Sequence, residues 1–197
     1  MDISVIDDGD FKVVQIDNTY TEEELELINL ELNFLCLSNK FLPPGEATGA
    51  GESKTGSGIF LDKVYSDRSV SNVLTLNRKI FELDVRELPV CFENFQYLDR
   101  DFTLLNYYEN KQGYGSHTDL AVYTFLTFLF QKPKRFTGGD LYFEDFDKHL
   151  DSAYNRTYIF QSWMKHQATN ISLPKRFQGK GLGRYSIACF AGFRCLD

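Results

Sequence analysis

The second half of the chain is a series of short apolar segments separated by turn residues, and this pattern restricts the fold more than any other feature. The segments are rich in β-branched and aromatic residues, and Gly, Pro, Asn and Lys cluster between them. Segments of four to eight such residues are typical of β-strands. Five predicted strands cover residues 102–108, 123–130, 140–143, 156–160 and 184–190. A run of roughly seven or eight strands predicts a β-sandwich or a jelly roll.

The first half of the chain is predicted to support these strands with helices. Residues 11–17 form a β-branched strand, and Thr21 followed by three glutamates predicts the start of a helix that extends through residue 35. Apolar spacing predicts a second helix over residues 66–85. Residues 47–58, rich in Gly, Ser and Thr, have few side chains able to anchor them and are predicted to form a mobile loop. The predicted class is mostly β with supporting α-helices.

Length and charge exclude several kinds of protein. A chain of 197 residues fits one domain, with residues 1–90 as the supporting part and 91–197 as the strand-rich core. Net charge −7 argues against a partner held by phosphate contacts, so no nucleic-acid partner is expected. We find no apolar run long enough for a membrane span and no signal-peptide pattern, which predicts a cytoplasmic protein. The four cysteines are predicted to be free thiols; they are Cys36, Cys91, Cys189 and Cys195.

His117 and Asp119 are the first candidate metal ligands. In extended chain, residues i and i+2 point to the same face, so this imidazole and carboxylate can bind one ion. The H-x-D pattern is weak by itself, because a surface histidine beside an N-capping aspartate has the same sequence. A third ligand is needed to favour a metal site.

His166 is the candidate third ligand, because it follows the predicted strand that ends near Trp163. Two histidines and one carboxylate on one face are typical of non-haem Fe(II) oxygenases. Zinc is the alternative ion, but its common helical H-E-x-x-H motif is missing from the sequence. The remaining histidine, His149, lies in a charged stretch and is interpreted as a solvated loop residue.

Arg184 and Ser186 share one face of a largely apolar predicted strand. An arginine is costly to bury there unless it binds an anion, and its planar guanidinium suits a carboxylate. The alternative is that Arg184 reaches solvent at the strand end or pairs with an internal Asp or Glu.

Together these residues resemble the prolyl 4-hydroxylase-like branch of the Fe(II)/2-oxoglutarate dioxygenases. The resemblance extends over nearly the whole chain. It rests on the Tyr-rich approach to H-x-D at residues 107–119, the F-T-G-G-D-L-Y-F turn at residues 136–143, the R-Y-S-I strand at residues 184–187, and the segment at residues 53–60. Only the H-x-D and G-G-D motifs are moderately specific alone, whereas their common order is a strong signal.

The resemblance implies a double-stranded β-helix (jelly roll, cupin-like) core and an oxidative chemistry. It implies His117, Asp119 and His166 as iron ligands, and Arg184 as the partner of the 2-oxoglutarate C5 carboxylate. Tyr107, ten residues before His117, matches a tyrosine that reaches the co-substrate, and Ser186 adds a hydrogen bond. The implied cofactors are Fe(II), 2-oxoglutarate and O2, with ascorbate as reductant, and the products are a hydroxylated substrate, succinate and CO2. Asp119 favours hydroxylation, because related halogenases lack this carboxylate.

Three departures from the family pattern limit what the resemblance implies. A basic loop at residues 174–183 is longer than in many relatives, and Phe128 stands where some relatives have a second co-substrate tyrosine. Lys54 stands in a segment where proline-recognising relatives have an arginine, so prolyl specificity is less secure than the chemistry.

Three hypotheses about function remain open at the level of sequence. The first is a peptidyl hydroxylase, prolyl among the options, and the second has the same iron site acting on a free amino acid or other small molecule. The third is a non-catalytic jelly-roll binding module, disfavoured because all three ligands and Arg184 are present. Demethylation of nucleic-acid bases is disfavoured because Phe190 stands where those enzymes have a second arginine. The sequence predicts no oligomeric state.

Overall fold

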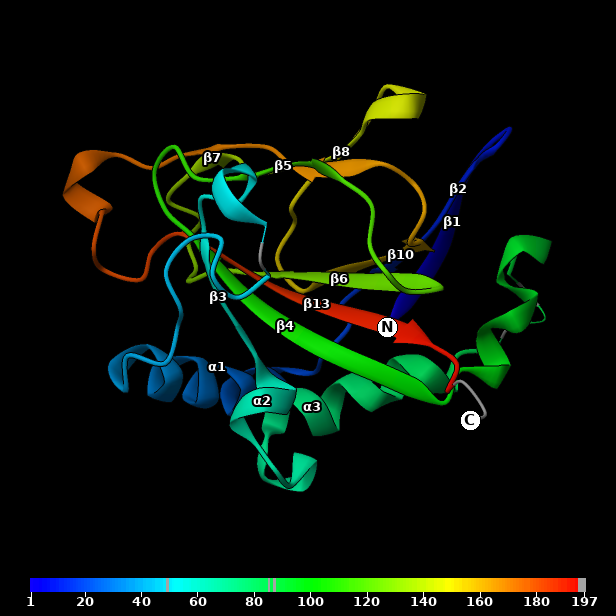
Figure 1. The fold of residues 1–197 in the computed structure, drawn as a ribbon, viewed down its shortest axis with the longest axis horizontal. Coiled ribbons are helices and arrows are strands. Elements are labelled where there is room, and N and C mark those ends of the chain that lie inside the picture. Colours follow the sequence, from blue (N-terminus) through cyan, green and yellow to red (C-terminus); the bar gives the residue numbers. More distant parts are fainter. Residues whose placement is uncertain (49, 85, 87, 195–197) are drawn as a thin grey trace.

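A computed structural model describes residues 1–48, 50–84, 86 and 88–194 of the chain. A large antiparallel sheet lies in the middle, with helices along one face and a smaller sheet over the other (Figure 1). The two facing sheets form a jelly roll, which confirms the predicted mostly-β class.

Seven strands form the large sheet in the spatial order β1-β2-β10-β6-β13-β4-β3. Their bounds are β1 Asp2–Asp8, β2 Phe11–Asp17, β3 Ser57–Phe60, β4 Arg100–Tyr108, β6 Tyr123–Leu129, β10 Arg156–Gln161 and β13 Arg184–Gly192. Strand β1 was not predicted. It is an edge strand paired only with β2 and is largely exposed on both faces, so it lacks the apolar alternation that identifies a half-buried strand.

Four short strands form the smaller sheet in the order β5-β11-β8-β9. They are β5 Tyr114–His117, β8 Leu141–Phe143, β9 Lys148–Leu150 and β11 His166–Ala168. A separate pair joins β7 Thr137–Gly138 to β12 Ile171–Ser172. These short strands hold the histidines and the glycine turn on one side of the roll.

The core has two parts because neighbouring residues of the large sheet face opposite ways. Leu104 points between the sheets, whereas Leu105 points toward the helices. Aromatic and branched side chains fill the space between the sheets; they include Phe11, Val13, Leu126, Phe128, Leu141, Phe143, Tyr158 and Phe160.

Helix α1 (Glu22–Leu37) begins at the predicted Thr21. The Thr21 hydroxyl accepts a hydrogen bond from the Glu24 amide, and the Glu24 carboxylate accepts one from the Thr21 amide, so both ends of a capping box are present. Ile28 and other apolar residues of α1 pack on the outer face of the large sheet, near Leu105 and Ile187.

The predicted continuous helix over residues 66–85 is wrong. The chain instead forms α2 (Leu61–Val64), a 3-10 turn at Arg68–Val70, α3 (Asn72–Leu76) and a 3-10 helix at Asn77–Glu82. Ser71 is extended and caps α3 through its hydroxyl, which interrupts the helix. Residue 85 lies outside the described residues. A further 3-10 helix occupies Val90–Tyr97.

The prediction of a mobile loop at residues 47–58 is wrong for residues 54–58, in a way that affects the site. Lys54 is only 1% exposed, Thr55 exchanges backbone and side-chain hydrogen bonds with Gly113, and residues 57 and 58 belong to β3. A Cβ at Gly56 would lie 2.4 Å from the Tyr108 ring. The small residues therefore allow close packing against β4, a role that their composition alone does not distinguish from flexibility. Residue 49 lies outside the described residues.

Two other predictions concern surfaces and thiols. Within the described residues, no helix is both long enough and apolar enough to cross a membrane. Cys36, Cys91 and Cys189 are free thiols, as predicted, and Cys195 lies outside the described residues.

Candidate metal centre

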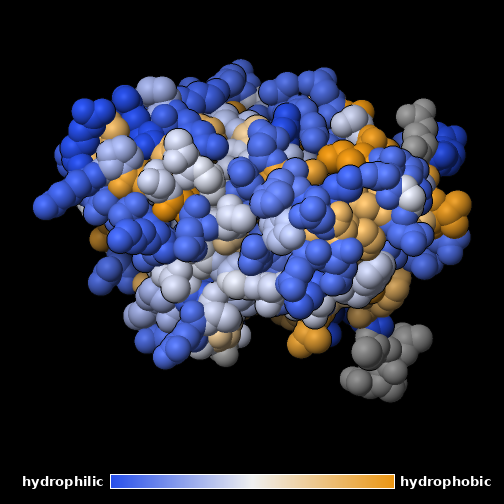
Figure 2. Space-filling view, turned by 90° about the horizontal axis from the view of Figure 1, so that it is seen from above, coloured by the Kyte–Doolittle hydropathy of each residue, from blue (hydrophilic) through white to orange (hydrophobic). Residues whose placement is uncertain are grey.

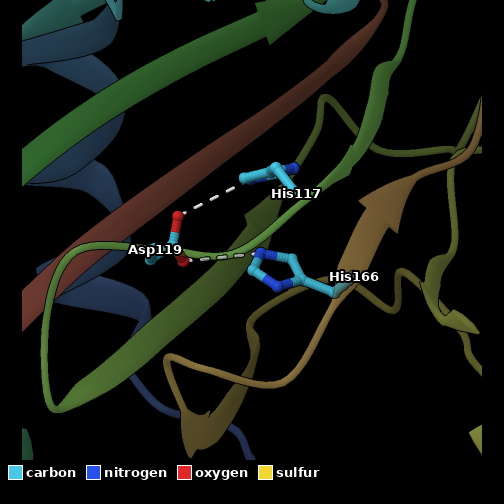
Figure 3. Close-up of side chains that lie close together, drawn as sticks. All are labelled: His117, Asp119 and His166. Carbon is cyan, nitrogen blue, oxygen red and sulfur yellow. Dashed lines mark ion pairs between the residues drawn. The ribbon is translucent and has the colours of Figure 1, made fainter. Parts of the chain in front are cut away.

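His117, Asp119 and His166 meet at one point, as the sequence predicts (Figure 3). The Nε2 atoms of His117 and His166 lie 3.6 and 3.4 Å from the two carboxylate oxygens of Asp119. One candidate ligand atom from each residue lies within 4.8 Å of the others. His166 is buried and the other two are partly buried.

The smaller sheet sets the spacing of the two histidines. His117 is the last residue of β5, His166 is the first residue of β11, and the two are directly paired in the antiparallel register. Directly opposite residues bring their side chains close together on one face. The two imidazole rings accordingly have centroids 4.4 Å apart.

Backbone carbonyls fix the orientation of both imidazoles. His117 Nδ1 lies 2.8 Å from Gly115 O, and His166 Nδ1 lies 2.8 Å from Met164 O. A carbonyl oxygen only accepts, so each Nδ1 donates and each Nε2 of a neutral ring keeps its lone pair for a metal. Burial, and then the neighbouring His166, lower the pKa of His117, which favours this neutral form.

Asp119 is held by one residue of strand β6 and by one residue of the turn after β10. The Asp119 amide donates to Ser162 O at 2.9 Å, and the Thr124 hydroxyl donates to Asp119 Oδ2 at 2.6 Å. Because the single Thr124 proton is used there, Ser162 donates its own hydroxyl proton to Thr124, at 2.9 Å. These contacts orient the carboxylate toward the histidines, so the donor set fits a two-histidine, one-carboxylate metal ion.

Arg184 lies in the same cavity as the three candidate ligands. It is 1% exposed, and its guanidinium carbon lies 4.5 and 5.2 Å from the ring centroids of Tyr108 and Phe128. Nη1 donates to Gly139 O, while Nε has no partner among the described residues. Arg184 forms no ion pair with any carboxylate of the described chain, and burial lowers its pKa. Such a cation suits an anionic ligand.

The G-G-D turn explains how Arg184 is oriented. Gly138 and Gly139 have φ of +70° and +82°, a conformation that other residues rarely adopt. A Cβ at Gly139 would lie 2.6 Å from Ile171 Cγ2 and 3.3 Å from Arg184 Cδ. The turn therefore requires glycine both for its backbone and for the close approach of its carbonyl to the guanidinium.

Ser186 lies where the sequence predicts, but Tyr107 does not. Ser186 is buried on the cavity side of β13, two residues from Arg184. Tyr107 points to the opposite, helix-facing side of β4, where its ring packs against Tyr185 and its hydroxyl donates to Glu109. The cavity is lined instead by Tyr108, which is paired with Arg184 in the sheet register.

His149 lies outside this site. Its side chain is exposed, as predicted, and stacks on Tyr142 at a centroid distance of 4.3 Å. It lies in strand β9, however, and not in a loop. The strand is only three residues long, which is too short for a clear alternation pattern.

Four residues of the site were not singled out as site residues from the sequence: Tyr108, Tyr114, Asn106 and Thr124. Tyr114 stacks on His117 with centroids 3.7 Å apart. Asn106 and Tyr108 alternate with Tyr107 along β4, and alternate residues of a strand point to opposite faces of the sheet. Once Tyr107 is known to face the helices, Asn106 and Tyr108 are therefore expected to face the cavity.

A wider groove of about 430 Å³ opens over the triad and is mainly apolar. Its walls include Phe60, Phe102, Leu120 and Phe190. A second hollow of about 430 Å³ shares the wall residues Phe102, Leu120 and Phe190 with it, so the two adjoin. In the view of Figure 2, hydrophobic residues interrupt the largely hydrophilic surface mainly in the right half.

Solved structures of prolyl hydroxylases share this fold. A Pseudomonas putida prolyl-4-hydroxylase aligns with a TM-score of 0.62 at 14% identity, with 93% of each chain covered. A viral collagen prolyl hydroxylase from Paramecium Bursaria Chlorella virus-1, solved as a 2OG complex, has a TM-score of 0.54 at 10% identity, covering 91% of this chain and 96% of its own.

A third similar structure is a Trichoplax adhaerens prolyl hydroxylase in complex with a hypoxia inducible factor oxygen degradation domain peptide fragment. Its TM-score is 0.62 at 13% identity, covering 91% of this chain and 83% of its own. No family model and no curated protein sequence matches the chain. At these identities the likeness establishes the jelly-roll fold of these hydroxylases, and the function must be argued from the site.

Proposed function

We propose that this chain is an Fe(II)- and 2-oxoglutarate-dependent dioxygenase that hydroxylates its substrate. The observation that carries the proposal is that one cavity holds both the His117, Asp119 and His166 donors and the buried Arg184. The triad suits non-haem Fe(II), and the arginine suits a carboxylate. The fold shared with prolyl hydroxylases, one of them solved as a 2OG complex, supports the same conclusion.

The cavity residues would bind and orient 2-oxoglutarate without reacting. Arg184 would hold one carboxylate, with the Ser186 hydroxyl on the same face and the Tyr108 ring beside the guanidinium. We propose Tyr108 for the role that the sequence resemblance gave to Tyr107, because only Tyr108 lines the cavity. When bound, iron and 2-oxoglutarate supply the oxidation: one oxygen atom of O2 enters the substrate and the other enters succinate, with loss of CO2. Ascorbate would serve as reductant.

A zinc site is less favoured by the same geometry. The cavity of the triad also holds Arg184, whose guanidinium donates to Gly139 O but has no carboxylate partner among the described residues, and this arrangement suits a dicarboxylate co-substrate of iron. Retention of Asp119, held by Thr124 and Ser162, favours hydroxylation over halogenation.

The substrate that fits best is a peptide. The groove over His117 and Asp119 is mainly apolar and open at the surface, and a second hollow adjoins it at Phe102, Leu120 and Phe190, an arrangement suited to a chain segment more than to an enclosed small molecule. A similar structure was solved with a peptide fragment bound. Proline is the favoured target residue, and hydroxylation of a free amino acid is the alternative.

The site can be tested by anaerobic binding of Fe(II) and 2-oxoglutarate, followed by succinate release when O2 is admitted. We expect His166→Ala to lose both metal binding and succinate release. His149→Ala is the matched control, because His149 is exposed and belongs neither to the triad nor to its cavity, and it should behave as wild type. Equal succinate release by wild type and His166→Ala would show that the proposed site is wrong.

The substrate class needs a separate measurement. Peptides from a cell lysate are incubated with the protein, Fe(II) and 2-oxoglutarate, and mass spectrometry should find one added oxygen on one residue type. Added oxygen only on free metabolites would contradict the peptide assignment and leave the chemistry intact.

A further inference from the structure

Lys54 is a buried cation next to the candidate site that the proposed chemistry does not use. It lies in the segment before β3 and is 1% exposed. Its ammonium group lies against the backbone of Gly58, where an added Cβ would approach Nζ to 2.7 Å. Gly58 thus leaves the space that the ammonium occupies.

The partners of the Lys54 ammonium are neutral. Nζ donates to Asn106 Oδ1 at 2.6 Å and lies 5.8 Å from the centroid of the Tyr114 ring. No carboxylate of the described residues forms an ion pair with it. Burial alone lowers the pKa of Lys54 to about 8, so the group is still mainly protonated at neutral pH. A buried ammonium with one neutral acceptor leaves two N–H groups for a ligand.

The position of Asn106 connects Lys54 to the cavity. Asn106 is 4% exposed and lines the same cavity as Arg184 and the triad, and its amide donates to Ser186 Oγ at 3.4 Å. The amide therefore bridges Lys54 to a residue on the face of Arg184.

Lys54 lies behind two residues that line this cavity, Asn106 and Tyr114. Tyr114, beside the Lys54 ammonium, stacks directly on His117, and the charge of Lys54 acts on His117. Arg184 instead contacts Gly139 and Tyr108. One buried cation, Arg184, thus lines the cavity that holds the triad, and a second, Lys54, contacts the cavity residues Asn106 and Tyr114.

We propose that Lys54 is a second carboxylate anchor of this cavity, which attracts the carboxylate of the 2-oxo acid end of 2-oxoglutarate while Arg184 holds the distal carboxylate. The assignment rests on the proposed function. It explains why an ammonium is retained where a methionine would fill the same space without a desolvation cost. Lys54 would be a binding residue, and Asn106 a positioning residue that orients it.

The test uses two ligands that differ by one carboxylate. 2-Oxoglutarate has both carboxylates, and 2-oxopentanoate has the 2-oxo acid end without the distal one. Binding of each to the Mn(II)-loaded protein is measured by calorimetry without O2, so that the readout is affinity and not turnover. Lys54→Met, Arg184→Met and Lys79→Met are compared; Lys79 pairs with Glu24 and lies outside the cavity.

The two cations should give different patterns. We expect Lys54→Met to raise the Kd of both ligands by a similar factor, roughly tenfold to a hundredfold. Arg184→Met should raise the Kd of 2-oxoglutarate alone and abolish its advantage over 2-oxopentanoate. Lys79→Met should match wild type for both ligands.

Asn106→Asp provides a second variant that keeps Lys54 and nearly the same shape. The new carboxylate would pair with the ammonium and compete with the ligand, so the Kd of both ligands should rise although the fold is intact. A carboxylate at position 106 also repels an anionic ligand directly, so a rise in Kd in Asn106→Asp supports the proposal only together with the rise in Lys54→Met.

The outcomes separate this proposal from the proposed function. If Arg184→Met behaves as expected but Lys54→Met and Asn106→Asp bind both ligands like Lys79→Met, the Lys54 assignment is wrong and the dioxygenase proposal stands. If Lys54→Met weakened binding of 2-oxoglutarate but not of 2-oxopentanoate, Lys54 would contact the distal carboxylate, and its assignment to the 2-oxo acid end would be wrong. Failure of wild type to bind either ligand in the presence of metal would overturn both proposals.

Discussion

Lys54 and Arg184 are each 1% exposed, so burial opposes the charge of both side chains. Neither has a carboxylate partner within the described part of the chain. Buried ligand-binding groups that have no partner of opposite charge in the protein itself commonly reduce its stability. This loss of stability should be measurable in the ligand-free protein.

Replacing Lys54 by methionine should therefore stabilise the ligand-free protein near neutral pH. The pKa falls from 10.5 to about 8 on folding, which corresponds to ~3 kcal/mol against the charged form. Loss of the hydrogen bond to Asn106 offsets about 1–2 kcal/mol of this, so we expect a net gain of about 1–2 kcal/mol in the free energy of unfolding.

The pH dependence of this gain follows from proton binding. Between pH 8 and 10.5 the unfolded chain binds more protons at Lys54 than the folded chain, so wild-type stability rises with pH across that window. The advantage of Lys54→Met should be constant below about pH 8 and disappear toward pH 10.5. Urea denaturation across this range measures it, and an advantage that persists at high pH would contradict the proposed origin.

Tyr107 and Tyr108 offer a matched pair of substitutions on adjacent residues. Tyr108 lines the cavity beside Arg184, whereas Tyr107 faces the helices and Glu109. We expect Tyr108→Phe to weaken 2-oxoglutarate binding by roughly threefold to tenfold, the effect of one hydrogen bond. Tyr107→Phe should leave the Kd unchanged. The reverse ranking would restore the assignment made from sequence spacing.

These two tyrosines show what the sequence can predict at the scale of residues. The i, i+2 spacing places His117 and Asp119 together, and the strand period places Ser186 on the face of Arg184. Counting back from His117 selects Tyr107, because the sequence does not show how the intervening turn positions β4 relative to β5. The pairing of Tyr108 with Arg184 sets that register.

At the scale of elements, Glu31 links α1 to α3. Its buried carboxylate accepts hydrogen bonds from Ser71 Oγ at 2.7 Å and from the Val73 amide at 2.9 Å. Glu31→Ala would leave both donors buried without a partner, so we expect a loss of about 2–4 kcal/mol in the free energy of unfolding. Glu26→Ala, at an exposed position of the same helix, should change stability by less than ~0.5 kcal/mol. Similar losses for both, measured by urea denaturation, would contradict the role of Glu31.

The contact of Glu31 also explains why the helix over residues 66–85 was predicted incorrectly. Val73, Leu74 and Ile80 are buried as their spacing predicts, whereas Val70, predicted on the same face, is 64% exposed. The interruption at Ser71 depends on a partner 40 residues away, which local periodicity does not contain. Strands β5 and β11, of four and three residues, were not predicted for the same reason. They are defined by pairing with strands that are distant in the sequence.

The glycine turn at residues 138–139 permits a test that separates backbone strain from contact with Arg184. Gly139 and Gly179 both have positive φ, but a Cβ at Gly139 would press on Ile171 and Arg184, whereas a Cβ at Gly179 meets nothing within 4 Å. Both Gly→Ala variants should lose about 1 kcal/mol of stability from the backbone. Only Gly139→Ala should also weaken 2-oxoglutarate binding. Equal affinities of the two variants by calorimetry would show that the turn does not orient Arg184.

At the scale of the whole molecule, the candidate site requires both sheets. Strands β5 and β11 hold the histidines, while β13 and β4 of the large sheet hold Arg184 and Asn106. The run of short strands was enough to predict a roll of two sheets, and the apolar N-terminal segments were enough to predict a helical layer. Lys54 was not predicted to lie beside the cavity. A glycine-rich sequence indicates a loop, and its packing against β4 is visible only in the structure.

The groove over the triad gives a prediction that depends on the shape of the whole face. Leu120 is fully exposed and lies where the two hollows meet, so an extended peptide crossing the groove would cover it. Leu120→Asp should raise the KM for a peptide substrate roughly tenfold, since it replaces an apolar contact by a charge that must be desolvated.

Slow 2-oxoglutarate turnover without substrate should be unchanged in Leu120→Asp, because Leu120 does not line the inner cavity. Leu37→Asp is the control, since Leu37 is a similarly exposed leucine at the end of α1, outside the groove. Succinate release with and without peptide measures both quantities. If Leu120→Asp and Leu37→Asp have the same KM, the substrate does not cross this groove, and a small molecule held within the inner cavity becomes the better candidate.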